Sequence, residues 1–418
     1  MVMAKAVEVL EQVKNAKDYG ISFGEATINL EKLNARKKTV TKIHVGGVKS
    51  LLEAYGVEVI QGAARFLSSS LIDVVGLDGI RRGLKVRRAI IASGTASAPA
   101  YLTGDTGLSI DTDQLLEVSA APPSILLIGG GATALTFATI FSSLGSKATV
   151  IEESDRVLPE IDQEITDLLQ RELKKNKIQV LTSAKPLRFF EGSGGEAELE
   201  VEVKGEKTKL KAACIVRTAR LPNIEGLGVL EIGVALNDHG GIMTDAAMET
   251  SVTSIFAAGD VTMNHLSTPV AYAEGLVAAA NIAGKKATIN YSAIPCWSNT
   301  IPAVCGAGLT EAEAKAKGYA IRIGRFPMAA NGMATVLGRR TGMVKMVIDE
   351  KYGQILGVHV MGHNAPELVH EVLLAMRSEL TPLDIADVFH VHPSLSEAFW
   401  DAANAADGAS INSFSPGA

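Results

Sequence analysis

His392 and Glu397, which lie five residues apart near the end of the chain, could together carry out acid–base chemistry. Imidazole titrates near neutral pH, so a histidine can both accept and donate a proton under ordinary conditions. A carboxylate just inside the helix that follows could hold the imidazole in one tautomer. A His-Pro pair at a helix start can also be a plain N-terminal turn, so neighbouring motifs must decide between the two interpretations.

A glycine-rich turn could bind a dinucleotide. It follows the apolar run at 125–128, opens a predicted helix and fits the pattern G-x-G-x-x-A with Gly129, Gly130, Gly131, Ala132, Thr133 and Ala134. Gly129 can make the tight turn, Gly131 lets the backbone approach a pyrophosphate, and Ala134 is small enough for the helix to pack on the strand. A doubly wound fold could also use such a turn for packing alone.

The choice of dinucleotide depends on Glu152. It ends the next predicted strand, 23 residues after Gly129. This is close to the spacing of about 20 residues expected for an acid that hydrogen-bonds the adenosine ribose. The next residue is Glu153, and no arginine lies beside it to offset the negative charge. Because a 2′-phosphate would meet like charge here, the sequence predicts NAD rather than NADP.

Asp260 could hydrogen-bond the hydroxyls of a sugar or a ribityl chain. It follows a short apolar strand predicted at 255–258 and then Gly259. The aspartate therefore emerges at the C-terminal edge of the strand, where open α/β sheets bind ligands. An aspartate in this position could instead cap the helix that follows.

The three cysteines show neither metal-ligand nor C-x-x-C spacing. Cys214, Cys296 and Cys305 are scattered along the chain. Their positions predict buried, reduced thiols in a cytoplasmic protein, with no metal site and no redox disulfide among them.

Length and charge exclude several classes of protein. The 418 residues are enough for two or three domains with a cofactor cleft, which excludes a small binding module. The net charge is -6 and no long basic block is present, so nucleic acid is not an expected partner. The most apolar window, at 124–144, is interrupted by glycines and hydroxyl residues, and the first residues are charged at helical spacing. We therefore expect no membrane span and no signal peptide.

The predicted elements form an α/β pattern. Helices are expected at 4–17 and 30–55, and short strands at 57–60, 71–75 and 86–92. A βαβαβ unit at 124–181 predicts a parallel sheet. Residues 189–211 are predicted to form a solvated hairpin around Gly205. A strand and an alanine-rich helix follow at 255–284. Alternating strands and then helices from residue 291 suit a separate α+β domain.

Seven short motifs occur together, and their order and spacing are more specific than any one of them. They are Ala92 to Thr95, Gly129 to Ala134, Arg220 to Asn223, Ala258 to Asp260, Pro269 to Ala271 with Glu274 and Gly275, Gly308 to Thr310, and His392 to Glu397. In the order and spacing of these motifs the chain closely resembles the flavin-dependent pyridine nucleotide-disulfide oxidoreductases. The resemblance extends from about residue 4 to residue 406. Within that family it is most similar to the dihydrolipoyl dehydrogenases.

The resemblance implies a homodimer with two Rossmann-like nucleotide-binding domains and an α+β dimerisation domain. It assigns FAD to residues 1–120 and 238–290, NAD to 121–237 and dimerisation to 291–418. Residues implied to contact FAD are Ser93, Gly94, Gly259, Asp260, Ser267, Thr268 and Pro269. Ala219 joins the residues of the glycine turn and Glu152 at the NAD site. His392 and Glu397 match the family's acid–base pair, which reaches a redox disulfide across the dimer interface. The other histidines near the end of the chain have no such match, and we expect them at a surface or interface: His359, His363, His370 and His390. The implied partner is a lipoylated protein of a 2-oxo acid dehydrogenase or glycine cleavage system.

The chain departs from the family pattern at its start. The family begins with a strand and a G-x-G-x-x-G turn for FAD and then a C-x-x-x-x-C redox pair, and neither occurs here. We therefore expect a flavin domain that is truncated at its N-terminus, with the chain opening just beyond these motifs. Smaller departures are Thr136, where the family usually has glutamate, and Ala219, where it usually has glycine.

Two interpretations of the function remain. The chain could be an NAD-dependent dihydrolipoyl dehydrogenase whose sequence lacks its first part. It could instead be a redox-inactive dimeric relative that binds NAD and acts as a scaffold or regulator.

Overall fold

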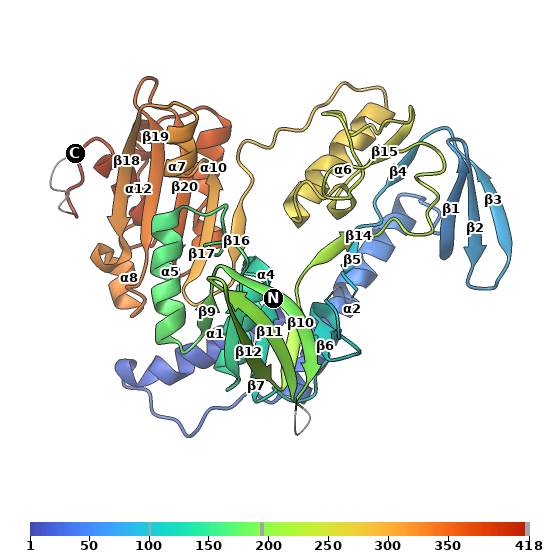
Figure 1. Ribbon diagram of the computed structural model, residues 1–418. Helices are drawn as coiled ribbons and strands as arrows, with labels where there is room; N and C mark the ends of the chain where they lie inside the picture. The colour runs from blue at the N-terminus through green and yellow to red at the C-terminus, as the bar shows by residue number, and fades with distance from the viewer. Residues whose placement is uncertain (100–101, 193–195, 414–418) are drawn as a thin grey trace. The chain divides into compact units, whose positions relative to one another are not determined.

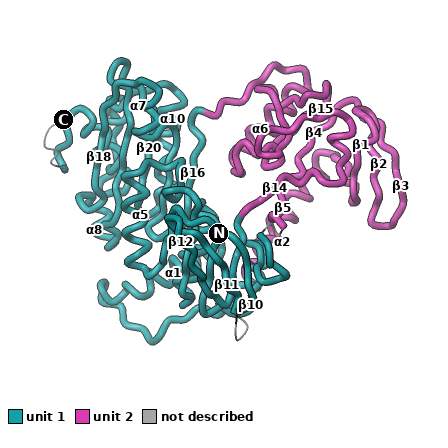
Figure 2. The backbone as a smooth tube through the Cα atoms, viewed as in Figure 1, with its two compact units in different colours: residues 1–35, 100–218, 292–418 teal, residues 36–99, 219–291 magenta. Residues whose placement is uncertain are grey.

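The computed structural model describes residues 1–99, 102–192 and 196–413, which divide into two compact units (Figures 1 and 2). Unit 1 contains residues 1–35, 100–218 and 292–418, and unit 2 contains 36–99 and 219–291. The chain is an α/β protein, as the sequence predicts.

A five-stranded parallel sheet forms the first part of unit 1. Its strand order is β6 (Ser109–Asp111), β13 (Cys214–Arg217), β7 (Ser124–Ile128), β8 (Lys147–Ile151) and β9 (Gln179–Leu181). The apolar runs of β7 and β8 are buried, as expected for strands covered on both faces. Helices α4 (Ala132–Ser143) and α5 (Gln163–Lys175) connect successive strands. This confirms the predicted βαβαβ unit.

Four described elements from the first 120 residues lie wholly in unit 1. Helix α1 (Val2–Asn15) contacts α4, and its buried Met3 and Val7 share a core with Phe137 and Phe141. A short helix, η1 (Ala16–Tyr19), ends at Gly20, whose left-handed φ of +75° allows it to cap the helix. Strand β6 pairs with β13 and leads into α3 (Thr112–Leu115).

The predicted hairpin is part of a three-stranded antiparallel sheet. It consists of β10 (Ala184–Glu191), β11 (Ala197–Val203) and β12 (Glu206–Ala212). The β11–β12 turn is at Lys204 and Gly205, which both have positive φ. Alternate residues of β11 are buried, so one face packs inward and the other carries the charged side chains.

The C-terminal part of unit 1 is a five-stranded antiparallel sheet with helices. The strand order is β16 (Cys296–Ser298), β17 (Ala303–Gly308), β20 (Ile355–Gly362), β19 (Met343–Asp349) and β18 (Ile321–Pro327). The helices are α7 (Glu311–Ala316), η4 (Met328–Ala330), α8 (Gly332–Val336), α9 (Ala365–Leu368), α10 (His370–Arg377), α11 (Pro382–Ala386) and α12 (Glu397–Ala405). Helix α12 contacts β18 and β19, and the core includes Phe326 and Phe399. The predicted α+β pattern is confirmed.

Unit 2 contains shorter sheets. Strands β1 (Gly62–Ser68), β2 (Leu71–Gly76) and β3 (Arg81–Lys85) form an antiparallel meander. Strand β4 (Ala89–Ile91) pairs in parallel with β15 (Ile255–Ala257), and β5 (Thr95–Ser97) pairs with β14 (Arg220–Pro222). Helix α6 (Thr268–Ile282) follows β15 after the short helix η3 (Asp260–Thr262). Strands β7 and β15 therefore lie in different sheets.

One predicted strand is wrong. Residues 57–60 form no strand, although their spacing of apolar residues favours one. They pair with no neighbouring strand, and Val57 and Val59 are 49% and 51% exposed. The helix before them, α2 (Leu30–Ala54), forms as predicted but has no buried side chain among its described residues. Strand propensity alone does not form a strand without a hydrogen-bonding partner.

Candidate active site and nucleotide sites

Gly129 makes the tight turn that the sequence predicts. It follows β7 with a φ of +113°, and its N–H donates to the carbonyl oxygen of Ile151 at 2.8 Å. A Cβ atom here would lie 2.6 Å from Oγ1 of Thr218, which itself donates to the carbonyl of Ile128 at 2.7 Å. Both the backbone conformation and the close approach therefore require glycine.

The N-terminus of α4 presents backbone amides at this turn. Gly131 is the N-cap, and Gly131 and Thr133 are exposed, whereas Ala134 is fully buried against the sheet. A Cβ atom at Gly131 would meet nothing within 4 Å. The positive end of a 12-residue helix and its free amides thus face open space, which suits a pyrophosphate.

Glu152 lies beside the turn. Its carboxylate accepts hydrogen bonds from the N–H groups of Gly130 and Ser154, the latter at 2.7 Å. A Cβ atom on Gly130 would lie 2.8 Å from Oε2 of Glu152, so glycine is needed for this approach. The glycine turn and Glu152, which the sequence analysis connected by their spacing, are therefore in direct contact.

Thr136 and Ala219, the two departures in this region, both have polar contacts. Oγ1 of Thr136 lies 3.2 Å from Oγ of the buried Ser298 and accepts from the N–H of Asn299 at 3.1 Å. The threonine thus joins α4 to the start of the C-terminal part of unit 1. Ala219 belongs to unit 2, where its carbonyl accepts from the N–H of Ala98 at 2.9 Å.

The residues implied to contact FAD all lie in unit 2. Because β4 and β15 run parallel, the segments after them, Ser93–Gly94 and Gly259–Asp260, emerge at the same edge. Gly259 has a φ of +80° and a ψ of −159°, and its N–H donates to the buried carboxylate of Glu274 at 2.6 Å. The hydroxyl of Tyr291 donates to the same carboxylate at 2.7 Å. Burial and this hydrogen bond raise the pKa of Tyr291, so the hydroxyl keeps its proton.

Asp260 is held at this edge by neighbouring polar side chains. The hydroxyl of Thr95 donates to its carboxylate at 3.4 Å, and Arg220 donates to the same hydroxyl at 2.8 Å. Arg220 also donates to the backbone carbonyl of Thr95 at 2.9 Å. Asp260 is in a short helical turn of its own, so its side chain is not the N-cap of α6, where Ser267 stands.

Two hydroxyls in this region are buried without a hydrogen-bond partner. Among the described residues, Oγ of Ser93 and Oγ of Ser267 both lack one. A buried hydroxyl without a partner is unfavourable unless a ligand supplies one. Thr268 and Pro269, which begin α6, are exposed, and Gly94 has a φ of +68°. The arrangement therefore fits a polar ligand such as the ribityl or phosphate part of FAD.

His392 and Glu397 are in contact. Nδ1 of His392 lies 2.8 Å from Oε1 of Glu397, and the N–H of Ser394 donates to Oε2 at 2.7 Å. Glu397 is the first residue of α12, and only 19% of its side chain is exposed. The histidine side chain is 79% exposed, so its other nitrogen is accessible. The predicted pair is thus brought together, with the carboxylate fixed and the imidazole open.

The remaining histidines and cysteines have other environments. We expected His359 at a surface or interface, and this is wrong because it is fully buried in β20. Cys214, Cys296 and Cys305 are free thiols. Burial raises the pKa of Cys214 to about 11 and those of Cys296 and Cys305 to about 12. None is a reactive thiolate at neutral pH.

Comparison with known families decides the identity of the chain. Residues 2–275 match the pyridine nucleotide-disulphide oxidoreductase family, and residues 294–403 match its dimerisation domain. The chain belongs to this family. Members use FAD and NAD(P), and the chain is a dihydrolipoyl dehydrogenase-like flavoprotein disulfide oxidoreductase.

Individual family members are similar over most of the chain. Dihydrolipoyl dehydrogenase of Thermus scotoductus is 36% identical over 405 residues, which cover 96% of this chain and 86% of that protein. The enzyme of the same name from Bacillus subtilis is 33% identical and covers 98% and 89%. Mitochondrial dihydrolipoyl dehydrogenase 2 of Arabidopsis thaliana is also 33% identical and covers 93% and 77%.

Solved structures share the fold. LpdA from Mycobacterium tuberculosis superposes with a TM-score of 0.88 at 22% identity, and the match covers 96% of this chain and 88% of that one. The HOCl-induced flavoprotein disulfide reductase RclA from Escherichia coli, in its Cu(II) complex, gives 0.83 at 22% identity, covering 97% and 89%. In the described part of this family member, no helix is long and apolar enough to cross a membrane.

Proposed function

We propose that this protein oxidises dihydrolipoamide carried on a lipoylated protein of a 2-oxo acid dehydrogenase or glycine cleavage system, with NAD as the final electron acceptor. The observation that carries the proposal is the contact of 2.8 Å between His392 and Glu397, with the imidazole exposed. The relatives named above, which are dihydrolipoyl dehydrogenases, support the choice of substrate.

The contact supports a role for His392 as a base. A carboxylate can only accept, so Nδ1 of His392 carries the proton that bonds to Glu397. The exposed Nε2 is then free to take a proton from a dihydrolipoamide thiol. The resulting thiolate attacks a protein disulfide, forms a mixed disulfide and releases a protein thiolate. The second substrate thiol then attacks the substrate sulfur of the mixed disulfide, which closes lipoamide and expels the other protein sulfur. The protein disulfide thereby becomes a dithiol that carries the two protons and two electrons of the substrate.

The residues at the edge formed by β4 and β15 would hold FAD. Ser93, Ser267 and Asp260 would supply hydroxyl and carboxylate partners at the edge formed by β4 and β15. Bound FAD supplies the two-electron relay from the protein dithiol to NAD. The chain's own contribution is to orient Asp260 through Thr95 and to fix Gly259 through Glu274.

We propose that the dinucleotide is NAD rather than NADP, bound through Gly129, Gly131 and Glu152. The exposed N-terminus of α4 supports a pyrophosphate site, and the carboxylate beside Gly130 supports a ribose contact. A 2′-phosphate would approach both Glu152 and the exposed Glu153, which repel it.

We also propose a homodimer with the four-segment division expected from the sequence. Residues 1–120 with 238–290 would serve FAD, residues 121–237 NAD, and residues 291–418 dimerisation. The match of 294–403 to the family's dimerisation domain and the β4–β15 pair support this division.

A second candidate function follows from the cysteines. Cys305 is buried, as expected, whereas Cys214 and Cys296 are only partly buried. All three are free thiols with raised pKa values, so they do not supply a redox disulfide. The hydroxyl of Thr136, where the family usually has glutamate, also lies 3.2 Å from the hydroxyl of Ser298. These observations favour a redox-inactive relative that binds NAD and acts as a dimeric scaffold or regulator.

NAD-dependent oxidation of dihydrolipoamide distinguishes the two functions. Residues 1–418 alone are expected to show no turnover, and joining a segment with G-x-G-x-x-G and C-x-x-x-x-C ahead of Ala4 should produce it. In that extended protein His392→Ala should lower kcat about 10²- to 10⁴-fold, because the proton acceptor is lost. His370→Ala, at an exposed histidine of α10, is the matched control.

Robust turnover by residues 1–418, abolished by His392→Ala, would contradict the need for the added disulfide. An extended protein that binds NAD and FAD but stays inactive would favour the scaffold function.

A further inference from the structure

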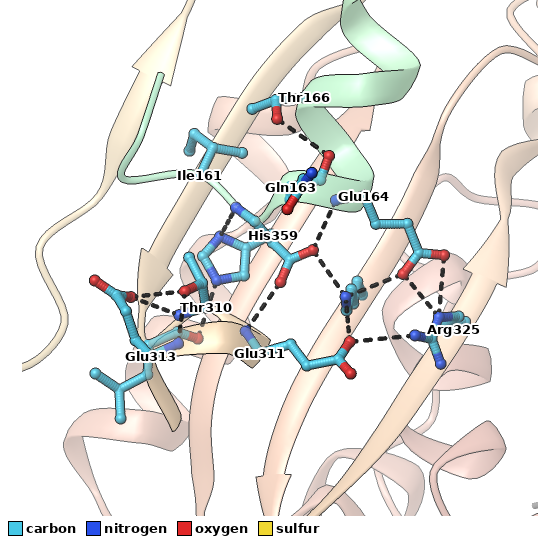
Figure 3. A network of polar contacts seen from close by, with 12 residues as sticks. Ile161, Gln163, Glu164, Thr166, Thr310, Glu311, Glu313, Arg325 and His359 are labelled. Atoms are coloured by element: carbon cyan, nitrogen blue, oxygen red, sulfur yellow. Dashed lines mark hydrogen bonds and ion pairs between the residues drawn. The ribbon is translucent and has the colours of Figure 1, made fainter. Parts of the chain in front are cut away.

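An ion cluster joins the start of α5 to the C-terminal sheet of unit 1 (Figure 3). Three cations and three anions form it: Lys315, Arg325, Lys345, Asp162, Glu164 and Glu311. Lys345, on β19, has only 3% of its side chain exposed. Its ammonium group lies 2.8 Å from the carboxylate of Asp162, 3.0 Å from that of Glu164 and 2.7 Å from that of Glu311. Asp162 is the N-cap of α5, Glu164 lies in its first turn, and Glu311 is the first residue of α7. All three N–H donors of the lysine can therefore be satisfied.

Asp162 connects two helices through this cluster. Its Oδ1 accepts from the N–H of Glu164 at 3.0 Å, and its Oδ2 accepts from the N–H of Glu311 at 2.9 Å. One buried carboxylate therefore caps α5 and α7 together. Burial raises the pKa of Asp162, but hydrogen bonds from Lys345 and the two backbone groups outweigh it and hold the pKa below its usual value. The aspartate stays charged at neutral pH.

The remaining groups around Lys345 complete the charge balance. Arg325 on β18 contacts Glu164 at 2.9 Å, and Lys315 on α7 contacts Glu311 at 2.6 Å. Glu313 of the same helix is engaged with Thr310. His359 on β20 accepts the N–H of Asp162 at Nδ1, so its other nitrogen donates to the carbonyl of Leu309. Burial lowers the pKa of His359, which is neutral and adds no charge.

The segment that precedes Asp162 supports the dinucleotide turn. The N–H of Leu158 donates to the carbonyl of Gly130 at 3.3 Å. Leu158 and Ile161 are buried in the same core as Ala134 at the start of α4. Residues 153–161 therefore connect Glu152 to the ion cluster. Midway along this segment, Leu158 contacts the glycine turn.

We propose that Lys345 is a positioning residue for dinucleotide binding. By fixing Asp162 it holds residues 153–161 against the turn, so that Gly130 and Glu152 keep their relative places. This inference rests on the proposed use of the turn for NAD. A buried ion pair often adds little net stability, because desolvation offsets the attraction. Asp162 has four polar contacts, with Lys345, Glu164, Glu311 and His359. We attribute to them the fixed position of residues 153–161 rather than a gain in stability.

Calorimetric titration of NAD into the full chain, at several pH values, tests the role of Lys345. Lys345→Met should raise the Kd for NAD about tenfold at pH 8, since small misplacements of binding groups cost affinity. The effect should shrink toward pH 5.5, because the carboxylates left without the lysine take up a proton more readily. Lys345→Arg keeps the charge and should restore binding to within about threefold. Lys175→Met removes an exposed lysine at the other end of α5, which pairs with Glu172 outside the cluster, and should leave the Kd unchanged.

The outcomes separate this inference from the NAD assignment. A folded Lys345→Met protein with wild-type Kd overturns the inference if Glu152→Ala still weakens binding. If Glu152→Ala has no effect either, the NAD assignment itself fails. If Lys345→Met does not fold, Asp162→Asn is measured instead. A raised Kd in Asp162→Asn supports the inference, and an unchanged Kd overturns it.

Discussion

The glycine turn of unit 1 and the flavin edge of unit 2 are built on the same principle but differ in how completely they are supported. The turn follows a central strand of a five-stranded parallel sheet, and Glu152 beside it has backbone partners. The flavin edge lies at a two-stranded parallel pair, β4 and β15, where Ser93 and Ser267 lack partners among the described residues. The first site is organised without its ligand, and the second has polar groups that a ligand would satisfy.

The two sites therefore differ in how much a ligand changes them on binding. A preorganised site loses little on binding, because its groups are already in place. A site with unpartnered buried hydroxyls gains hydrogen bonds only when the ligand arrives.

Gly129→Ala should have the largest effect. The substitution places a Cβ atom 2.6 Å from Oγ1 of Thr218 at a φ of +113°. We expect a loss of about 2–4 kcal/mol in the free energy of unfolding, measured by urea denaturation. Gly131→Ala is the matched control, because its Cβ would enter open space and its φ is −76°. It should leave the stability unchanged and weaken NAD binding, since the methyl group stands where a pyrophosphate approaches. Equal stability of the two variants would contradict the described turn.

Ser267→Ala should have a smaller effect of opposite sign. Loss of an N-cap hydroxyl usually costs about 0.5–2 kcal/mol, but Ser267 makes no capping bond. Removing its unpartnered oxygen should therefore raise the free energy of unfolding of the chain by up to about 1 kcal/mol. Ser146→Ala, which removes a hydroxyl that donates to the carbonyl of Pro122 at 2.6 Å, should instead lower it. Destabilisation by Ser267→Ala would show that the hydroxyl has a partner.

The cysteines of unit 1 give the smallest effect. Because burial raises their pKa values to about 11 and 12, alkylation by iodoacetamide should be slow at pH 8 and should rise about tenfold per pH unit toward pH 11. Above about pH 8.5, the usual pKa of the unfolded thiols, ionisation favours the unfolded state, so stability should fall as pH rises. Labelling in urea is the control and should be fast at pH 8.5. Rapid modification of the folded chain at pH 7 would show that unit 1 is open.

Strong local patterns made much of the fold predictable. The β7–α4–β8 unit was predictable because its apolar runs are buried and its glycines have fixed conformational roles. Strand β6 was not predicted, because its three residues carry no clear alternation. Residues 57–60 have strand propensity but no partner, and a pattern within one segment does not reveal whether a partner exists.

The sites were predictable to different extents. Spacing was enough to bring Glu152 to the turn and Glu397 to His392, because each pair spans a short, regular connection. The ion cluster was not predicted, because its members come from positions between 162 and 345 and meet only through tertiary packing. His359 was assigned to a surface because nothing in its local sequence shows that both faces of β20 are covered.

Calorimetry with NAD and NADP on the wild-type chain and on Glu152→Ala tests whether the glycine turn and Glu152 bind NAD. We expect NAD to bind more tightly than NADP, and Glu152→Ala to lose about 1.5–3 kcal/mol of NAD binding free energy, since a charge-assisted hydrogen bond disappears. This corresponds to a rise in Kd of about 10- to 150-fold. Glu153→Ala, at the exposed neighbour, should leave NAD binding unchanged. Equal affinity for the two dinucleotides, together with an unaltered Kd in Glu152→Ala, would contradict NAD binding through Glu152.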